Sequence, residues 1–221
     1  MHYSSVIFDL DGTLLDTLED LADAGNKVLM QSGYPTHPVE AYKYFVGDGL
    51  QALIEKITPE SATHADVSTC FDLFKTVYAQ GWRIKTSLYP GVEDLLNGLR
   101  KAGLNVAVLS NKPHDFTLLC VDHFFPRVSF QSVYGQREGV PKKPDPAGAL
   151  HIAAELGVEP ESCVYVGDTK IDMHTGKSAG MFTIGVLWGF RTADELREHG
   201  ADILVQHPTE LLDVIWNLQQ D

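Results

Sequence analysis

Six short apolar segments recur along the chain, and each is rich in β-branched residues. Their apolar positions do not alternate with polar ones, which is typical of strands buried on both faces of a parallel sheet. The predicted strands span residues 5–8, 106–109, 132–134, 164–166, 182–186 and 203–205.

Helical patterns separate these predicted strands. Apolar residues recur every three or four positions over residues 92–99, 150–156 and 211–216, which is the spacing of one face of an α-helix. Gly103 and Gly157 follow the first two stripes and mark helix ends. Strands that alternate with helices predict a doubly wound α/β domain on a parallel sheet.

One long stretch breaks the alternation. Residues 17–86 contain helical stripes and no convincing strand, so we expect an all-helical insert after the first strand. The predicted core domain therefore comprises residues 1–16 and 87–221, and the predicted helical cap comprises residues 17–86. Hinges are expected near residues 16–17 and 87–90.

Composition and charge narrow the class of protein. The chain has 221 residues, of which 44% are hydrophobic, and a formal net charge of −13. These values fit a soluble globular protein. The negative charge disfavours a nucleic-acid partner or an anionic membrane surface, since both require a basic face. The sequence leaves open whether the protein is a monomer or a homodimer.

Cysteine usage and the N-terminal segment indicate a cytoplasmic protein. Cys70, Cys120 and Cys163 share no metal-ligand spacing and are expected to be small apolar residues in a reducing compartment. The first apolar run lacks a preceding basic segment and is cut at Asp9, unlike a signal peptide. No apolar stretch approaches the ~20 residues that a membrane span needs.

Polar residues cluster where the predicted strands end. Asp9 follows the first strand, "SNK" at residues 110–112 follows the second, and "GDTKID" at residues 167–172 follows the fourth. The segment "KKPDP" at residues 142–146 precedes the helix that leads to that fourth strand. Ligands of open parallel sheets bind at the carboxyl ends of the strands. We therefore expect these carboxylates, lysines and hydroxyls to converge on one crevice.

Asp9 and Asp11 raise an electrostatic question. Residues two apart in an extended segment share a side, so both carboxylates should face the crevice while Leu10 turns into the core. Gly12 permits the sharp turn that follows. Two carboxylates ~4 Å apart repel by about 4 kcal/mol at an effective dielectric constant of ~20, and a divalent cation would reverse this penalty. The spacing does not fit an EF-hand. The alternative is a pair of exposed turn aspartates.

The other polar stretches also allow two interpretations. Asp168 is either a metal ligand, with Asp172 one helical turn later on the same face, or a helix cap, a role that Thr169 could also fill. Ser110 and the residue after it either hold an oxyanion or cap the next helix. The lysines of "KKPDP" either neutralise a phosphate or lie in a solvated turn.

Together these stretches resemble the four signature motifs of the haloacid dehalogenase superfamily. "DLDGTLLDT", "SN", "KP" and "GDTKID" occur in that family's order, and the likeness extends through "YPGV" and "GVLWGFRTADELREHGADILV". "VGDGLQALI" is similar to the cap loop of the phosphoglycolate phosphatase-like branch. The resemblance covers essentially the whole chain and implies a Rossmann-like core with an inserted helical cap.

The resemblance implies catalytic roles for three residues. Asp9 would be the nucleophile, Asp11 the general acid and base, and Lys143 the motif lysine. Lys142 is the alternative for the lysine position. Dehalogenase members lack the second aspartate and the related ion pumps carry threonine there, so Asp11 indicates a phosphatase or a mutase.

The resemblance also implies a Mg²⁺ site and a phosphoryl-binding site. The metal ligands would be Asp9, the backbone carbonyl of Asp11, and Asp168. Asp172 would support either the metal site or Lys143. The expected substrate-binding residues are Ser110, Asn111 and Thr13.

These expectations lead to one favoured function and several alternatives. The favoured function is magnesium-dependent hydrolysis of a small phosphorylated metabolite through an aspartyl phosphate, with 2-phosphoglycolate as the favoured substrate. The alternatives within the superfamily are a pyrophosphatase, a nucleotide or sugar phosphatase, and a β-phosphoglucomutase. A non-catalytic binding protein is disfavoured because Asp9, Asp11 and Asp168 are all present.

Overall fold

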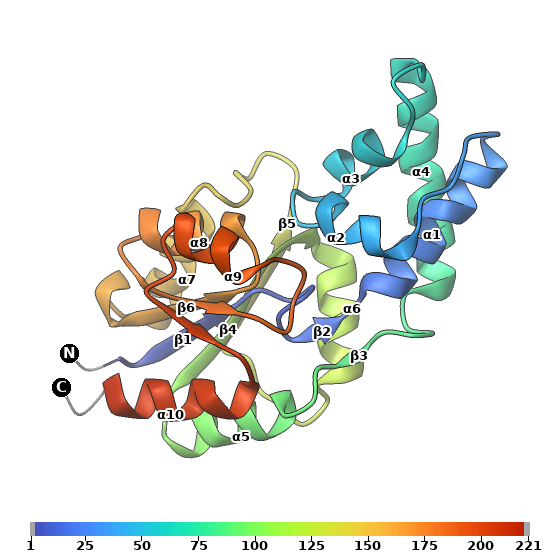
Figure 1. The fold of residues 1–221 in the computed structure, drawn as a ribbon. Coiled ribbons are helices and arrows are strands. Elements are labelled where there is room, and N and C mark those ends of the chain that lie inside the picture. Colours follow the sequence, from blue (N-terminus) through green and yellow to red (C-terminus); the bar gives the residue numbers. More distant parts are fainter. Residues whose placement is uncertain (1–2, 219–221) are drawn as a thin grey trace.

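A six-stranded parallel sheet forms the centre of the molecule (Figure 1). The computed structural model describes residues 3–218. The strand order is β5-β4-β1-β6-β7-β8, and every neighbouring pair is parallel. The predicted α/β class and all six predicted strands are confirmed. The strands are β1 (Ser5–Phe8), β4 (Asn105–Pro113), β5 (Ser132–Gln136), β6 (Cys163–Gly167), β7 (Phe182–Val186) and β8 (Ile203–Val205).

Helices cover both faces of the sheet. Val6 and Phe8 of β1 pack into one apolar cluster, and Ile7 between them packs into the other. Both faces of β1 are therefore buried, which explains why its sequence shows no alternation. The first face carries α5 (Val92–Lys101), α6 (His114–Phe124) and α10 (Pro208–Leu218); the other side carries α7 (Ala147–Leu156), α8 (Lys170–Ser178) and α9 (Ala193–Glu198).

The segment between β2 (Leu15–Asp16) and β3 (Ser87–Leu88), here called the helical insert, lies beyond the carboxyl ends of the central strands (Figure 1). α1 and α4 pack side by side, with the shorter helices against them. As expected from the sequence, this segment is helical and adds no strand to the central sheet. The division of the chain into two domains stays a prediction. The helices are α1 (Leu18–Gln31), α2 (Tyr42–Phe45), α3 (Leu50–Ile57) and α4 (His64–Gly81).

A two-stranded antiparallel ladder joins the ends of the helical insert. β2 (Leu15–Asp16) pairs with β3 (Ser87–Leu88), at the two places where hinges were predicted. This ladder could not be predicted, because two-residue strands are too short to produce an apolar pattern. Hinge motion at this ladder stays a prediction.

β4 is longer than predicted. Pairing with β5 resumes at Pro113 opposite Gln136 after an irregular register, so the strand continues beyond residue 109. α6 begins at His114 with Pro113 in the capping position. Ser110 and Asn111 therefore do not cap this helix. Of the two interpretations of this segment, the helix cap is excluded and the oxyanion-binding role stays a prediction.

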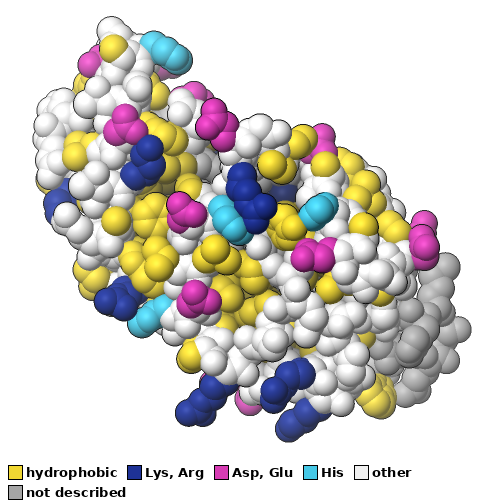
Figure 2. Space-filling view, turned by 180° about the vertical axis from the view of Figure 1, so that it is seen from behind, with side chains coloured by type: hydrophobic (Ala, Val, Ile, Leu, Met, Phe, Trp, Pro, Cys, Tyr) yellow, Lys and Arg dark blue, Asp and Glu magenta, His cyan; other side chains and the backbone are white. Residues whose placement is uncertain are grey.

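The surface shows acidic and basic side chains interspersed on the face seen in Figure 2. Within residues 3–218, no helix has the length and hydropathy of a membrane span. Cys70, Cys120 and Cys163 are buried and free, which agrees with their expected packing role. The exclusion of nucleic acid and the cytoplasmic location stay predictions.

Asp20 of α1 fastens the helical insert to the segment that returns to the core. Its buried carboxylate accepts hydrogen bonds from the backbone N–H groups of Lys85 and Thr86, and from the Thr86 hydroxyl at 2.7 Å. In Asp20→Asn an amide NH₂ group would face these donors. We expect a loss of about 2 kcal/mol in the free energy of unfolding, measured by urea denaturation.

Asp23→Asn provides the matched control for this prediction. Asp23 lies on the same helix, and its exposed carboxylate pairs with Lys85 Nζ at 2.8 Å. Exposed pairs of this kind contribute little to stability, because water and salt screen them. If the two variants lose the same unfolding free energy, the buried hydrogen bonds of Asp20 do not stabilise the protein more than an exposed ion pair does.

Candidate active site

The sequence motifs meet at the topological switch point of the sheet. From β1 the chain first builds β4 and β5 on one side, and then β6, β7 and β8 on the other. Asp9 follows β1, Ser110 lies in β4 and Asp168 follows β6. Parallel pairing of these three adjacent strands brings their carboxyl ends to one edge, where ligands of such sheets bind.

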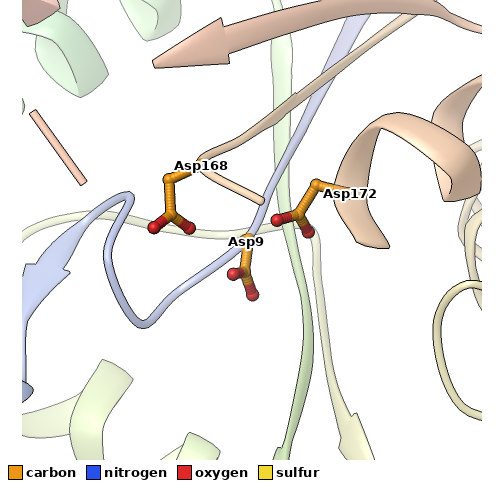
Figure 3. Close-up of side chains that lie close together, drawn as sticks. All are labelled: Asp9, Asp168 and Asp172. Carbon is orange, nitrogen blue, oxygen red and sulfur yellow. The ribbon is translucent and has the colours of Figure 1, made fainter. Parts of the chain in front are cut away.

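Three buried aspartates converge at this edge. One carboxylate oxygen from each of Asp9, Asp168 and Asp172 lies within 4.8 Å of the others. Figure 3 shows these carboxylates approaching from the end of β1, the end of β6 and the first turn of α8. Asp9 is 7% exposed, and the other two are fully buried. The structure therefore concentrates negative charge away from water.

Close backbone approach holds Asp168 in place. Gly12 has a φ of +88°, and a Cβ atom there would lie 2.3 Å from Asp168 Oδ2; a Cβ on Gly189 would lie 2.3 Å from the Asp168 Cβ. Only glycine fits at these two positions. Phe190 donates its backbone N–H to Asp168 Oδ2 at 2.7 Å, and Thr13 donates its hydroxyl to Oδ1 at 3.4 Å. Thr13 thus contacts a predicted metal ligand.

Asp172 links helix α8 to the reaction centre. Its Oδ2 accepts hydrogen bonds from the backbone N–H and the hydroxyl of Thr169, at 3.0 and 2.7 Å. Thr169 is therefore the cap of α8, completing a capping box. Oδ1 of Asp172 accepts from Lys143 Nζ at 2.8 Å. Of the two supporting roles expected for Asp172, this contact favours the one toward Lys143.

Lys143 is buried between two carboxylates. Its Nζ lies 2.7 Å from Asp9 Oδ1 as well as 2.8 Å from Asp172 Oδ1. The adjacent Lys142 is exposed and donates instead to the backbone carbonyl of Asp48 at 2.6 Å. The structure therefore brings Lys143, and not Lys142, to the predicted nucleophile.

The amide of Asn111 positions this lysine. Asn111 Oδ1 accepts from the backbone N–H of Lys143 at 2.9 Å, and Nδ2 donates to the carbonyls of Lys143 and Gly47, each at 3.0 Å. These three hydrogen bonds use both ends of the amide. Asn111 was predicted to bind substrate, whereas its side chain here connects the lysine segment to the helical insert.

Asp11 pairs with Lys112, which was not among the predicted site residues. Lys112 Nζ lies 2.9 Å from Asp11 Oδ1 and 2.9 Å from the hydroxyl of Tyr78, a residue of α4. Lys112 is 6% exposed and Tyr78 2%. Lys112 could have been found from its place directly after Ser110 and Asn111 at a strand end. Tyr78 could not, because it belongs to an ordinary apolar helix stripe.

A cavity separates the helical insert from the sheet edge. Asp9, Asp11 and Ser110 line its floor, and the Ser110 hydroxyl accepts from the Lys112 backbone N–H at 3.2 Å. Thr13 is buried beside Asp168 and does not line this cavity. Most of the remaining lining is apolar and comes from the insert and α6: Leu21, Val46, Gly47, Gly49, Leu50, Leu53, Phe74 and Phe116.

Burial and mutual repulsion perturb the pKa values of the site. Burial raises the pKa of Asp9 to about 7, although Lys143 opposes the rise. Burial also raises the pKa of Asp168 well above its usual range, and the charges of Asp172 and Asp9 add to this. Burial lowers the pKa of Lys143, but the carboxylates of Asp172 and Asp9 outweigh it and raise that pKa strongly. Asp9 and Asp168 therefore hold their protons to a higher pH than ordinary aspartates do.

The residues present fit a hard divalent cation. Asp9, Asp168 and Asp172 supply carboxylate oxygens within 4.8 Å of one another, and Lys143 is the lysine that contacts them among the residues described. Carboxylates and backbone carbonyls are the ligands that Mg²⁺ prefers. Burial is the main cause of the raised pKa values of Asp9 and Asp168, and a bound cation would favour the ionised form of both carboxyls.

The chain is similar over most of its length to known proteins. The family model of haloacid dehalogenase-like hydrolases matches residues 6–186. A phosphoglycolate phosphatase of Pseudomonas putida is 35% identical over 213 residues, covering 94% of this chain and 75% of that protein. One from Chromobacterium violaceum is 33% identical over 220 residues, covering 98% of each. A crystal structure from Lactobacillus delbrueckii subsp. bulgaricus is 34% identical with a TM-score of 0.91, covering 97% of this chain and 99% of that chain.

Removing Lys143 should destabilise the protein in a pH-dependent way. In Lys143→Met, with a chelator present, Asp9 and Asp172 lose their shared counter-charge. We expect a loss of about 3 kcal/mol in unfolding free energy at pH 8. At pH 6 the loss should be smaller, because the folded-state pKa of Asp9, about 7 with the lysine present, rises further and the carboxyl is protonated. Urea denaturation at both pH values measures the difference.

The control for this variant is Lys177→Met. Lys177 Nζ pairs with Asp202 Oδ1 at 2.6 Å on the surface, with 45% of its side chain exposed. The unfolding free energy of Lys177→Met should fall by at most about 1 kcal/mol. A loss in Lys143→Met that is the same at pH 6 and pH 8 would contradict the electrostatic explanation.

Proposed function

The chain belongs to the haloacid dehalogenase-like hydrolase family and is a phosphatase, and on that premise we propose that it hydrolyses 2-phosphoglycolate in a magnesium-dependent reaction. The observation that carries the proposal is the environment of Asp9. This carboxylate stands at the end of the central strand, 2.7 Å from the Lys143 ammonium and within 4.8 Å of Asp168. It also lines the cavity under the helical insert. A nucleophile, a counter-charge and a candidate metal ligand are thus adjacent.

The first half of the proposed reaction transfers the phosphoryl group to Asp9. A carboxylate oxygen of Asp9 attacks phosphorus in line with the ester oxygen, so that the bond to Asp9 forms as the ester bond breaks. Asp11, in its protonated form, gives the leaving oxygen a proton, and the alcohol departs. Lys143 and the Ser110 hydroxyl face the negative charge on the transferring group.

The second half releases phosphate. Asp11, now ionised, takes a proton from a water molecule as that water attacks phosphorus. The bond between phosphorus and Asp9 breaks, and the Asp9 carboxylate is restored. Lys112 donates to only one oxygen of Asp11, Oδ1. Among residues 3–218, no hydrogen bond engages Oδ2 of Asp11, so this oxygen can carry the proton.

Magnesium would be held by Asp9, the backbone carbonyl of Asp11, and Asp168. When bound, the cation supplies positive charge that reduces the repulsion between a phosphate dianion and the acidic cluster. The helical insert lines the cavity with apolar side chains. In our proposal it acts as the cap that keeps water away from the reacting groups.

Replacing the nucleophile should abolish turnover. Phosphate release from 2-phosphoglycolate with Mg²⁺ should fall at least about 1,000-fold in Asp9→Asn, because the amide cannot form the phosphoryl intermediate. A parallel screen of the wild type should include pyrophosphate, nucleotides and sugar phosphates. A strong preference for one of these compounds would contradict the proposed substrate. Full activity of Asp9→Asn would contradict the proposed mechanism.

Metal affinity should increase with pH. Since burial raises the pKa of Asp9 to about 7 and that of Asp168 well above its usual range, Mg²⁺ must compete with protons below neutral pH. We expect the dissociation constant of Mg²⁺ to be at least about tenfold lower at pH 8 than at pH 6. Isothermal titration calorimetry should also detect proton release on binding. A pH-independent affinity would contradict metal binding through carboxyls that are protonated at pH 6.

A further inference from the structure

The cavity beside the reaction centre offers a substrate few polar contacts. Six of its lining side chains are aliphatic or phenyl groups: Leu21, Val46, Leu50, Leu53, Phe74 and Phe116. Hydroxyl groups on a leaving group would lie against carbon there and lose their hydrogen bonds to water. The wall therefore disfavours polyhydroxylated substrates such as sugar phosphates.

Lys112 and Tyr78 place polar groups beside these apolar side chains. Lys112 is the single cationic side chain among the lining residues described. Its ammonium has three N–H donors, and two of them are used by Asp11 Oδ1 and the Tyr78 hydroxyl, each at 2.9 Å. Tyr78 accepts in that contact, so its own O–H remains available. One N–H and one O–H can thus be donated at the same point.

Three other cationic side chains of the insert have contacts outside the cavity. Lys43 pairs with Glu40 at 2.8 Å, and Lys85 pairs with Glu19 and Asp23. Arg83 lies over the ring of Trp82. None of these three side chains lines the cavity. Within the described part of the chain, an anionic group that enters the cavity therefore meets Lys112.

We propose that Lys112 and Tyr78 recognise a carboxylate on the leaving group of the substrate. This inference rests on the proposed phosphatase function and narrows its substrates to short phosphorylated hydroxy acids. A carboxylate presents two acceptor oxygens, which match one ammonium donor and one phenol donor. The two side chains meet at one point of the cavity lining, although Lys112 comes from β4 and Tyr78 comes from α4.

The position of Lys112 also limits the length of the leaving group. Lys112 Nζ is 2.9 Å from Asp11, and Asp11 must reach the ester oxygen to protonate it. A carboxylate held by Lys112 therefore lies close to the ester oxygen, with very few atoms between them. In 2-phosphoglycolate a single CH₂ group separates the two, which satisfies this constraint.

The test compares 2-phosphoglycolate with ethyl phosphate, which has a methyl group in place of the carboxylate. With Mg²⁺ present, wild-type kcat/KM should favour 2-phosphoglycolate by at least about 100-fold. Lys112→Met should reduce this preference at least about tenfold, mainly through KM, and Tyr78→Phe should reduce it about fivefold. Longer esters, 3-phosphooxypropionate and 4-phosphooxybutyrate, should be progressively poorer substrates of the wild type.

Lys75→Met is the matched control. Lys75 lies on α4 one turn before Tyr78, pairs with Asp72 on the surface and does not line the cavity. Removal of its charge should leave the preference unchanged. A similar effect of Lys75→Met and Lys112→Met would indicate a general effect of charge and overturn the proposal.

Two outcomes separate this proposal from the underlying function. If Lys112→Met slows both esters equally, the lysine acts only through Asp11 and the recognition site is overturned while the phosphatase stands. If the wild type releases phosphate from no ester at all, the proposed function itself fails, and this proposal with it. Should Lys112→Met not fold, Tyr78→Phe decides, and an unchanged preference in that variant overturns the proposal.

Discussion

Repulsion among buried carboxylates, balanced by the Lys143 ammonium, is the constraint on which the site depends. Asp9 and Asp172 share this lysine at 2.7 and 2.8 Å. Asp172 also completes the capping box of α8 with Thr169, so the charge balance at Asp9 and the start of a helix depend on one side chain. Asn111 fixes the backbone of the lysine from β4. Elements on both sides of β1 thereby contribute to the ionisation of a single carboxyl group.

The structure gives the two aspartates of the first motif different counter-charges. Asp9 pairs with Lys143, and Asp11 pairs with Lys112. Without these lysines, two carboxylates one residue apart would share one electrostatic environment. Separate lysines from different segments give the two carboxylates different surroundings, which suits the two different roles that we propose for them. This division of roles requires long-range packing, since Lys112 is 101 residues from Asp11.

The strands and the edge where the aspartates lie could be predicted from the sequence because both depend on local patterns. A buried strand needs a run of apolar residues, and Asp9 and Asp168 directly follow such runs. Contacts between distant segments could not be predicted in this way. Tyr78 reaches Lys112 only because α4 packs over the sheet edge, and nothing in an apolar helix stripe distinguishes its tyrosine from a packing residue. The hydrogen bonds of Asn111 to two backbone carbonyls likewise have no sequence signal.

The short β2–β3 ladder has a consequence for how such a protein can diversify. Because Leu15 lies opposite Leu88, the chain leaves the core and returns to it at neighbouring points. A segment with adjacent ends can be lengthened, shortened or exchanged without a change in the distance that the core must span. The apolar wall over the cavity could therefore be rebuilt while Asp9, Lys143 and Asp168 keep their positions. Lys112, as part of β4, would remain in place through such an exchange, but its partner Tyr78 would not.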